Sequence, residues 1–314
     1  MMLKYYASQI LPRKYIRQLR SAAARRARDR RKQVPFGEGD LLFTLREICG
    51  VKNGDVLFVH SSIDGLAMDI SPRRILQLLL DTVGPEGTIL MPSYPKLTSY
   101  AFLQSGQVWD VRRTPSYSGL LTEIFRRMEG TRRSLHPTKS VAARGPRRDE
   151  LIGEHHTDIR PYGAASPYYK FITAGGKAIG IGVSVRYIAF IHAIDDHLGE
   201  RFPVTTYRGA PLPGKVLDYS GEPMEVATLA HDLRLSYDPV GLLRRHVPRE
   251  QAHSLTYKSR EFFYADAKTV FEIGVRLAQQ GITIYDGRLK TARRRLLTIR
   301  SPRRRQPVRE RVTQ

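Results

Sequence analysis

The sequence has a single cysteine and no long hydrophobic run. Cys49 is the only cysteine among 314 residues, which excludes an intrachain disulfide and any metal site made of several cysteines. We expect Cys49 to be a small buried side chain. Apolar stretches fall short of the roughly 18 residues that a membrane-spanning helix needs, and charges interrupt the start of the chain before a signal-peptide core could form. These absences predict a cytoplasmic protein.

Acidic residues are also scarce, with 30 Asp and Glu against 52 Lys and Arg, and the net charge is +22. Residues 1–33 carry +10 of this charge and residues 290–314 carry +9, which leaves +3 for the rest of the chain. Two basic tails therefore flank a nearly neutral body. A nucleic acid or an anionic membrane surface is a candidate partner for the tails only, and solvated tails without a partner are the simpler interpretation.

Charge and composition together predict one main domain at residues 34–289. The N-terminal extension, 1–33, contains SAAARRARDRRKQ, which favours a basic helix whose apolar side is only alanine. We expect this helix not to hold firmly to a core. The tail at 290–314 combines proline with dense positive charge, which predicts a flexible, disordered segment.

Between the tails, short apolar runs alternate with amphipathic segments. This pattern predicts an α/β fold, with helices layered on both faces of a central mixed sheet as an α/β/α sandwich. Ser71 and Pro72 are expected to open a helix that Gly84 ends. We expect strands at 55–60, 87–92, 140–144 and 177–182, and helices at 72–83, 118–128, 147–155, 188–198 and 265–280.

The predicted helix at 188–198 carries a histidine and an acid on one face. His192 and Asp195 are three residues apart, so their side chains can meet. A carboxylate beside an imidazole raises its basicity and fixes its orientation, as a general base requires. Such pairs are also common as ordinary surface contacts. Asp196 is a possible substitute for Asp195.

Short polar segments follow the predicted strands in a fixed order. They are HSSIDGLA (60–67), MPSYP (91–95), RRTPSYSGLL (112–121), LHPTKSVAARGP (135–146), the turn ASPYYKF (165–171), GGKAIGIGVS (175–184) and IHAID (191–195). Together these segments resemble the aminoglycoside 3-N-acetyltransferase family. The resemblance runs over about residues 37–285, and HPTKSVAARGP is its most specific part.

This resemblance implies direct transfer of acetyl from acetyl-CoA to a primary amine of an aminosugar or aminoglycoside, with His192 as the base, Asp195 as its acid and no metal. Hydroxyl and backbone N–H groups at strand ends and helix starts can hold the pantetheine arm and pyrophosphate. The candidates for this role are Ser61, Ser62, Thr114, Ser116 and Gly119. Helix capping is the alternative role for Thr114 and Ser116, and a polar strand end for Ser61 and Ser62.

His136 and Ser140 are expected to shape the wall between the two substrates. His136 is a candidate for a direct chemical role, with the stitching of a loop beside Pro137 as the alternative.

Asp195 stands where the family usually has glutamate, which shortens the acid's arm by one methylene. Two other departures from the family pattern bear on the acceptor. Residues 187–190 stand where a hydroxyl residue is common shortly before the histidine, and Lys139 stands where a second histidine is frequent. A polycationic aminoglycoside needs an acidic pocket. Candidate residues for such a pocket are Asp64, Asp69, Asp158, Asp196 and Glu200. The alternative acceptor is a nucleotide-linked or polysaccharide aminosugar.

Two other classes of function are possible. A nucleic-acid-binding protein could use the basic tails, although no aromatic residues are interleaved with the charges as a stacking platform. A metal hydrolase could use some of His155, His156, His192 and His197, although their spacing matches no metal signature.

Overall fold

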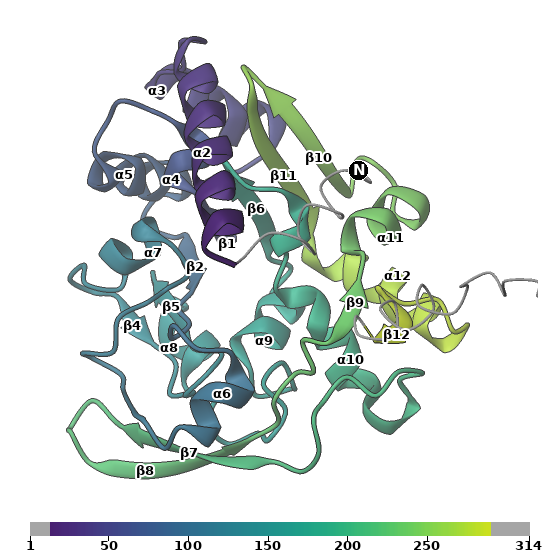
Figure 1. Ribbon diagram of the computed structural model, residues 1–314. Coiled ribbons are helices and arrows are strands. Elements are labelled where there is room, and N and C mark those ends of the chain that lie inside the picture. The colour runs from purple at the N-terminus through teal and green to yellow at the C-terminus, as the bar shows by residue number, and fades with distance from the viewer. Residues whose placement is uncertain (1–12, 290–314) are drawn as a thin grey trace, which may run out of the picture.

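A computed structural model describes residues 13–289, and its centre is a seven-stranded mixed sheet in the order β10-β11-β6-β1-β2-β5-β4 (Figure 1). The parallel strands β6 (Lys177–Ile181), β1 (Val56–Ser61) and β2 (Thr88–Pro92) form its middle. The flanking strands pair antiparallel; they are β4 (Arg132–Arg133), β5 (Val141–Arg144), β10 (Ala252–Tyr257) and β11 (Arg260–Asp266).

Alternate residues of the central strands enter two separate cores. Leu57 and Val59 of β1 face one core, and Val56 and Phe58 face the other. The first is covered by α3 (Glu38–Phe43), η1 (Thr44–Ile48), α5 (Pro72–Val83) and α7 (Leu120–Phe125). The second is covered by α8 (Arg148–Ile152), α9 (Pro167–Thr173), α10 (Ala193–Leu198), α11 (Pro239–His246) and α12 (Ala267–Gln279). The predicted α/β/α sandwich is confirmed.

Local signals in the sequence set most of these boundaries. The predicted strands at 55–60, 87–92, 140–144 and 177–182 are β1, β2, β5 and β6. Ser71 caps α5 by accepting from the Arg74 N–H, with Pro72 at the first helical position, as predicted. Cys49 is buried, also as predicted, and burial raises the pKa of its thiol to about 12.

Two local predictions are wrong. The segment 188–198 is not one helix but a 3₁₀ turn, η3 (Phe190–His192), followed by α10. The turn predicted at 165–171 continues as the helix α9, because Ser166 accepts from the Tyr169 N–H and Pro167 occupies the first helical position. The helices predicted at 118–128 and 147–155 are shorter, as α7 and α8.

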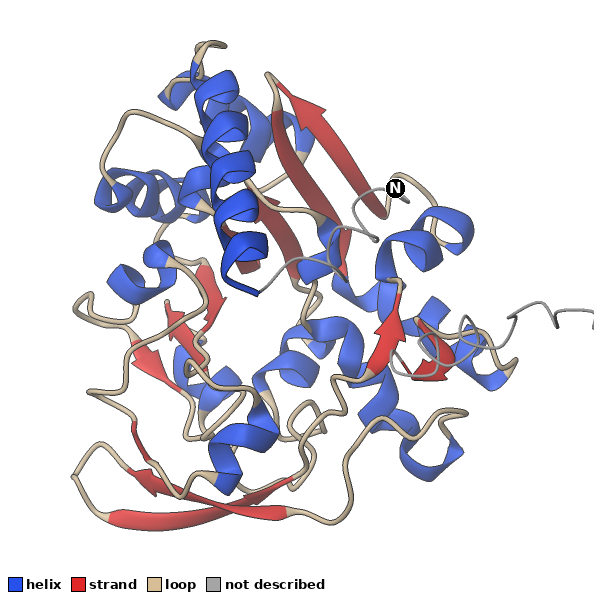
Figure 2. Cartoon of the chain, viewed as in Figure 1, coloured by secondary structure: helices blue, strands red, loops and turns tan. Residues whose placement is uncertain are grey.

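Two small sheets were not predicted (Figure 2). One joins β3 (Val108–Asp110), β7 (Leu212–Leu217) and β8 (Pro223–Thr228) over a core that includes Trp109, Val216 and Val226. The helix α6 (Ser99–Gln104) packs against β7. The other pairs β9 (Leu235–Tyr237) with β12 (Tyr285–Leu289), segments far apart in the sequence. This second pairing brings the last described residues back to the main domain.

The basic N-terminal extension contains the helix α2 (Arg13–Lys32), which lies against the outside of the domain (Figure 1). Arg28 contacts Asp64 at 3.2 Å and Lys32 contacts Asp69 at 3.7 Å, and these exposed ion pairs contribute little stability. Within the described residues, no helix has both the length and the apolar character to cross a bilayer. The tail predicted to be disordered, 290–314, lies outside the described residues.

Candidate active site

Two adjacent parallel strands send the chain to opposite faces of the sheet at their carboxyl ends. After β1 the chain enters α4 (Ile63–Leu66) and α5, and after β6 it enters η2 (Val185–Tyr187), η3 and α10. The two connections meet where the Ser62 N–H donates to the Ile181 carbonyl at 3.0 Å. Doubly wound sheets commonly bind ligands at such a switch point, and this one carries the predicted segments 60–67 and 175–184.

His192 and Asp195 meet as predicted, and a tyrosine contacts both. Nδ1 of His192 lies 3.4 Å from Oδ2 of Asp195, which is longer than a well-formed N–H···O bond. The Tyr285 hydroxyl lies 3.0 Å from the same nitrogen and 2.7 Å from the same oxygen. The His192 side chain is 19% exposed, whereas that of Asp195 is 2% exposed. Solvent therefore reaches the imidazole but not the acid.

These contacts determine which nitrogen of His192 carries the proton. Burial raises the pKa of Tyr285 well above its usual value, so the phenol keeps its proton, which it donates to Asp195. The phenol oxygen can then only accept from His192, so Nδ1 carries the imidazole proton. In this tautomer Nε2 has a free lone pair, as a general base requires.

A second histidine, which the sequence analysis missed, lies beside this group. Nε2 of His231 is 3.8 Å from Oδ2 of Asp195 and has no hydrogen-bond partner within residues 13–289, and its ring centroid lies 4.6 Å from that of His192. Burial lowers the pKa of His231 to about 4, so the ring is neutral at pH 7. Burial would raise the pKa of Asp195, but the two histidine rings outweigh it and hold that pKa below its usual value. Asp195 is therefore a carboxylate.

His192, Asp195 and His231 could together offer ligands to a metal, since their ligand atoms lie within 4.8 Å of one another. Nδ1 of His192 and Oδ2 of Asp195, however, both contact the Tyr285 hydroxyl. The set proposed for a metal hydrolase is not assembled in the described part of the chain, where His155 is instead fixed between Ser134 and the Pro161 carbonyl.

An aromatic series joins His192 to the predicted segment 112–121. We call Tyr94, Tyr162 and Tyr168 the tyrosine cluster. The Tyr162 ring lies 5.2 Å from that of His192 and 4.6 Å from that of Tyr168, whose hydroxyl is 2.7 Å from that of Tyr94. The Tyr94 N–H donates to the Ser118 hydroxyl. The tyrosine cluster thus forms a continuous wall that connects His192 to Ser118.

Lys139 lies on this wall. Its Nζ is 4.8 Å from the ring centroid of Tyr94 and 5.8 Å from that of Tyr162. Burial lowers the pKa of the Lys139 amine to about 8, and no carboxylate pairs with it among the described residues. The Lys139 ammonium therefore lies over the Tyr162 ring, which in turn packs beside the His192 ring.

His136 and Ser140 are both buried in the loop before β5. Nδ1 of His136 accepts from the N–H groups of Thr138 and Lys139, so Nε2 donates to the Thr228 hydroxyl. Burial holds the pKa of His136 well below its usual value. Ser140 donates to the Ser134 carbonyl. The hydrogen bonds of His136 and Ser140 therefore hold the loop that carries Lys139 in place.

The residues predicted to hold the cosubstrate have mixed environments. Ser62 caps α4 by accepting from the Gly65 N–H. Thr114 accepts from the Asp110 N–H within a turn, and the buried Ser116 accepts from the Ser118 N–H at 3.3 Å.

Ser61 and Gly119 come together at the start of α7. Gly119 has φ +117°, and a Cβ added there would lie 3.4 Å from the Ser61 carbonyl oxygen. The structure therefore brings the end of β1 and the start of α7 into contact.

The acids proposed for a polycation pocket lie in different environments. Asp64 and Asp69 pair with α2, Asp158 accepts from the Arg160 N–H, and Glu200 is exposed on η4 (Gly199–Arg201). Asp196 accepts from the Tyr162 N–H and the Tyr207 hydroxyl, so it does not substitute for Asp195. Burial raises the pKa of Asp196 to about 7.

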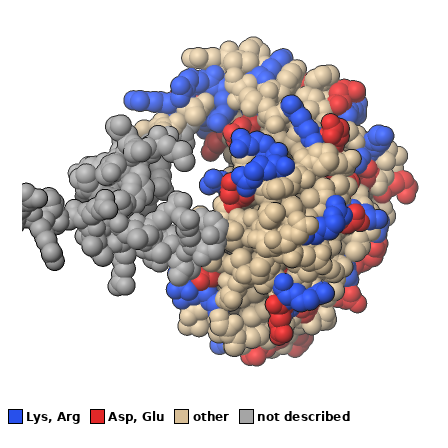
Figure 3. Space-filling model, turned by 90° about the vertical axis from the view of Figure 1, so that its right-hand side faces the viewer, with Lys and Arg blue, Asp and Glu red and all other residues tan. Residues whose placement is uncertain are grey.

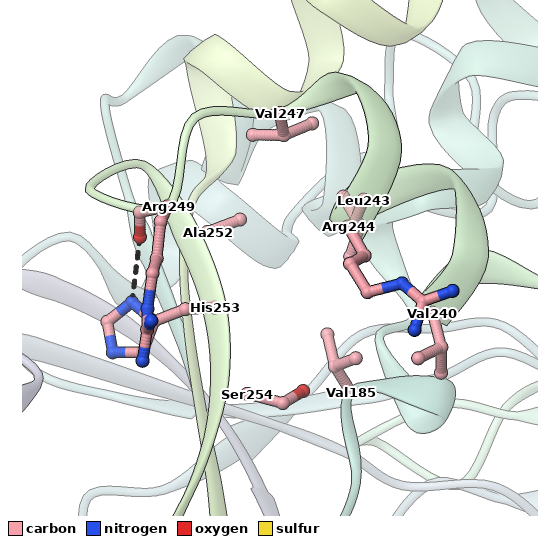
Figure 4. Close-up of a pocket in the computed structure, with 9 residues that line it drawn as sticks. All are labelled: Val185, Val240, Leu243, Arg244, Val247, Arg249, Ala252, His253 and Ser254. Atoms are coloured by element: carbon pink, nitrogen blue, oxygen red, sulfur yellow. Dashed lines mark hydrogen bonds between the residues drawn. The ribbon is translucent and has the colours of Figure 1, made fainter.

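Charges of both signs are interspersed on the face drawn in Figure 3, as expected for a nearly neutral body. A separate cavity of about 370 Å³ lies between α11 and β10, with Arg244 and Arg249 on opposite sides of it (Figure 4). None of the predicted site residues lines this cavity.

The sequence model of the family described as aminoglycoside 3-N-acetyltransferase matches residues 58–279. The chain belongs to this family. The aminoglycoside N(3)-acetyltransferase IX of Micromonospora chalcea is 31% identical over 171 residues, covering 49% of this chain and 60% of the relative. The aminoglycoside N(3)-acetyltransferase III of a Salmonella species is 30% identical over 183 residues, covering 53% and 63%. The chain thus spans about three fifths of the length of these relatives.

Solved acetyltransferase structures share the fold. A sisomicin-bound AAC-VIa has a TM-score of 0.64 at 23% identity, covering 79% of this chain and 100% of that one. AAC(3)-Xa has a TM-score of 0.66 at 21% identity, covering 81% and 96%. A binary complex of AAC-IIIb with CoASH has a TM-score of 0.63 at 22% identity, covering 79% and 98%.

Within this family fold, the sequence analysis missed Tyr285 and His231. Tyr285 lies in β12, 93 residues from His192 in the sequence, and no motif surrounds it. His231 forms an isolated bridge with Tyr207 just after β8. Only the pairing of distant segments places these residues beside His192, so no local pattern could have indicated them.

Proposed function

We propose that the chain transfers acetyl from acetyl-CoA to a primary amine of an aminosugar, with His192 as the general base. The observation that carries this proposal is the partly exposed imidazole of His192, whose Nδ1 lies 3.4 Å from the buried carboxylate of Asp195 while the ring remains open to solvent. Family membership and a CoASH-bound structural relative support the choice of cosubstrate. The proposed function also implies a cytoplasmic location, where acetyl-CoA is available.

In the proposed reaction, the amine nitrogen attacks the thioester carbonyl while Nε2 of His192 accepts the proton that the amine loses. Asp195 stabilises the resulting imidazolium because its carboxylate is ionised and buried. The tetrahedral intermediate then collapses, the C–S bond breaks, and the thiolate of CoA takes the proton from His192. An N-acetyl amine and free CoA leave, with no covalent acyl-enzyme.

The cosubstrate is proposed to lie near the contact between Ser61 and Gly119, with Ser62, Thr114 and Ser116 supporting the surrounding loops. His136 and Ser140 are proposed to hold the wall loop rather than to touch the reacting atoms, since both His136 ring nitrogens are engaged. The domain is proposed to comprise residues 34–289.

The test is a CoA-release assay on the His192→Ala variant. Removing a general base should lower kcat by about 10²–10⁴-fold, whereas the Kd for CoA should stay within about twofold, because the imidazole is needed for proton transfer and not for holding the cosubstrate. His253→Ala, which alters a half-buried histidine on β10 that is not one of the site residues, is the matched control and should keep full activity. A His192→Ala variant with wild-type turnover would remove the mechanism.

The reaction is proposed to need no metal, so exhaustive dialysis against EDTA should leave turnover unchanged. Loss of activity on dialysis, with recovery on adding Zn²⁺, would instead assign a metal role to the group of His192, Asp195 and His231.

Lys139 favours a second candidate acceptor, an aminosugar that carries an anionic group such as a nucleotide diphosphate. Among the described residues no carboxylate pairs with its ammonium, which lies on the wall beside His192, and Asp64 and Asp69 form ion pairs with α2 instead. A panel of aminoglycosides and nucleotide-linked aminosugars distinguishes the two acceptors.

For the anionic acceptor, KM should rise above about pH 8, because the Lys139 amine then loses its charge. Lys139→Gln should raise KM at pH 7 and remove this pH dependence. If Lys139→Gln instead lowers KM for aminoglycosides and has no effect on anionic acceptors, the antibiotic is the substrate.

A further inference from the structure

The contact between His192 and Asp195 is too long to orient the imidazole alone. Their 3.4 Å separation exceeds the range of about 2.7–3.2 Å over which an N–H···O bond is well formed. An aspartate is one methylene shorter than a glutamate, and the fixed spacing of three residues limits how far Asp195 can approach. Another group is needed to hold the ring firmly.

We propose that the Tyr285 hydroxyl is a positioning residue that completes the pair by relaying the hydrogen bond from His192 to Asp195. The inference rests on the function proposed above. The phenol oxygen accepts from Nδ1 of His192 at 3.0 Å, and the phenol proton goes to Oδ2 of Asp195 at 2.7 Å. Both distances lie within the normal range for hydrogen bonds.

Burial makes this relay one-directional. The Asp195 side chain is 2% exposed, and its pKa lies below its usual value, so it accepts and does not donate. Tyr285 retains its proton because burial raises its pKa. With the phenol proton directed to the carboxylate, only the tautomer with Nδ1–H is compatible with the network. Tyr285 thereby fixes both the orientation and the tautomer of His192.

If Tyr285 had only a structural role, replacing it with phenylalanine would not affect His192. Its ring packs edge-on against Phe202 at a centroid distance of 6.1 Å, a contact that a phenylalanine would keep. Tyr285→Phe therefore removes the hydroxyl and leaves the packing. Any effect on His192 beyond a change in stability reports on the relay.

The kinetic experiment compares Tyr285→Phe with Tyr207→Phe in the full chain. Tyr207 also donates to a buried aspartate, Asp196, and so is a matched control that leaves the His192–Asp195 contact intact. We expect Tyr285→Phe to lower kcat by about tenfold, less than the loss of the base itself, with KM for acetyl-CoA unchanged. Tyr207→Phe should keep kcat within about twofold.

Rescue by a longer acid then tests the relay itself. In the Tyr285→Phe background, Asp195→Glu supplies the missing methylene, so the carboxylate can reach Nδ1 directly and kcat should recover. Asp195→Asn should give no recovery in that background, because a neutral amide does not stabilise the imidazolium. If Asp195→Glu lowers kcat equally with and without the hydroxyl at 285, the relay is absent.

A spectroscopic readout separates this inference from the proposed reaction. ¹⁵N NMR of the His192 ring should show mainly the Nδ1–H tautomer in the native chain and an increased share of the Nε2–H tautomer in Tyr285→Phe. An unchanged tautomer ratio would overturn the relay even if the enzyme is active. Absence of acetyl transfer in the native chain, with the tautomer shift present, would overturn the function and leave the relay.

Discussion

Two buried aspartates that are neighbours in the sequence differ in charge state at neutral pH. Asp195 and Asp196 are neighbours in the sequence, yet hydrogen bonds and histidine contacts lower the pKa of the first while burial raises that of the second to about 7. One acid is thus ionised at neutral pH and the other is half protonated. Adjacent positions are assigned different roles by their contacts alone.

The raised pKa of Asp196 predicts a stability that depends on pH. Below about pH 4 its carboxyl is protonated in the folded and unfolded chains alike. Between about pH 4 and pH 7 only the unfolded chain ionises, so the free energy of unfolding falls as pH rises, and the loss is complete above pH 7.

Asp196→Asn should therefore stabilise the fold at pH 8 by up to about 4 kcal/mol and have little effect near pH 4. Urea unfolding at the two pH values measures the difference, with Asp81→Asn on the surface of α5 as the control. An Asp196→Asn effect that is the same at both pH values would show that burial does not raise this pKa.

At the scale of residues, the sequence indicated the half of the site that is local. His192 and Asp195 are three residues apart, and a helical turn suffices to bring them together. Tyr285 and His231 depend on β12 and on the bridge to Tyr207, which only the folded chain creates. The charge of Asp196 likewise depends on burial, which no spacing reveals.

At the scale of elements, close backbone contact fixes the junction between the loops after β1 and β6. Gly65 in α4 lies so near Gly182 that a Cβ on Gly65 would be 1.8 Å from the Gly182 carbonyl oxygen. The absence of both side chains lets the two connections touch at the switch point. The sequence showed these glycines but not that they meet.

Gly65→Ala should destabilise the protein by about 1–3 kcal/mol, because backbone atoms must move to admit the methyl group. Gly39→Ala in α3 is the control. A Cβ at Gly39 meets no atom within 4 Å, so alanine should be neutral or stabilise by about 0.5–1 kcal/mol. Thermal unfolding of both variants measures the contrast, and equal melting temperatures would contradict the close contact.

Elements with strong local signals were predicted best. The capped helix α5 and the apolar strands β1, β2 and β6 follow from their own residues. The small sheet of β3, β7 and β8 was missed because its strands are short or half exposed and pair with segments far away in the chain. The turn at 165–171 became α9 because its Ser-Pro start also opens a helix.

At the scale of the whole molecule, most of the net charge lies outside the domain that contains the site. The segments 1–33 and 290–314 carry nearly all of the net charge of +22, whereas the site belongs to the nearly neutral body. Within the described part of the N-terminal extension, α2 contacts the body through exposed ion pairs.

Deleting residues 1–33 and 290–314 together should leave the rate of acetyl transfer within about twofold, because exposed ion pairs add little to stability. The same deletion should greatly weaken retention on heparin, since that retention depends on clustered positive charge. Replacing the arginines of both segments with glutamine, at full length, is the control. A nucleic-acid-binding protein would instead lose its only activity with the tails.

The pairing of β12 with β9 has a consequence for how the protein matures. Tyr285 reaches His192 only after β12 has paired with β9, which consists of residues Leu235–Tyr237. A nascent polypeptide on the ribosome could already have formed the central sheet and still lack a correctly set imidazole. Catalytic competence would then arise only once β12 has been synthesised and has paired with β9.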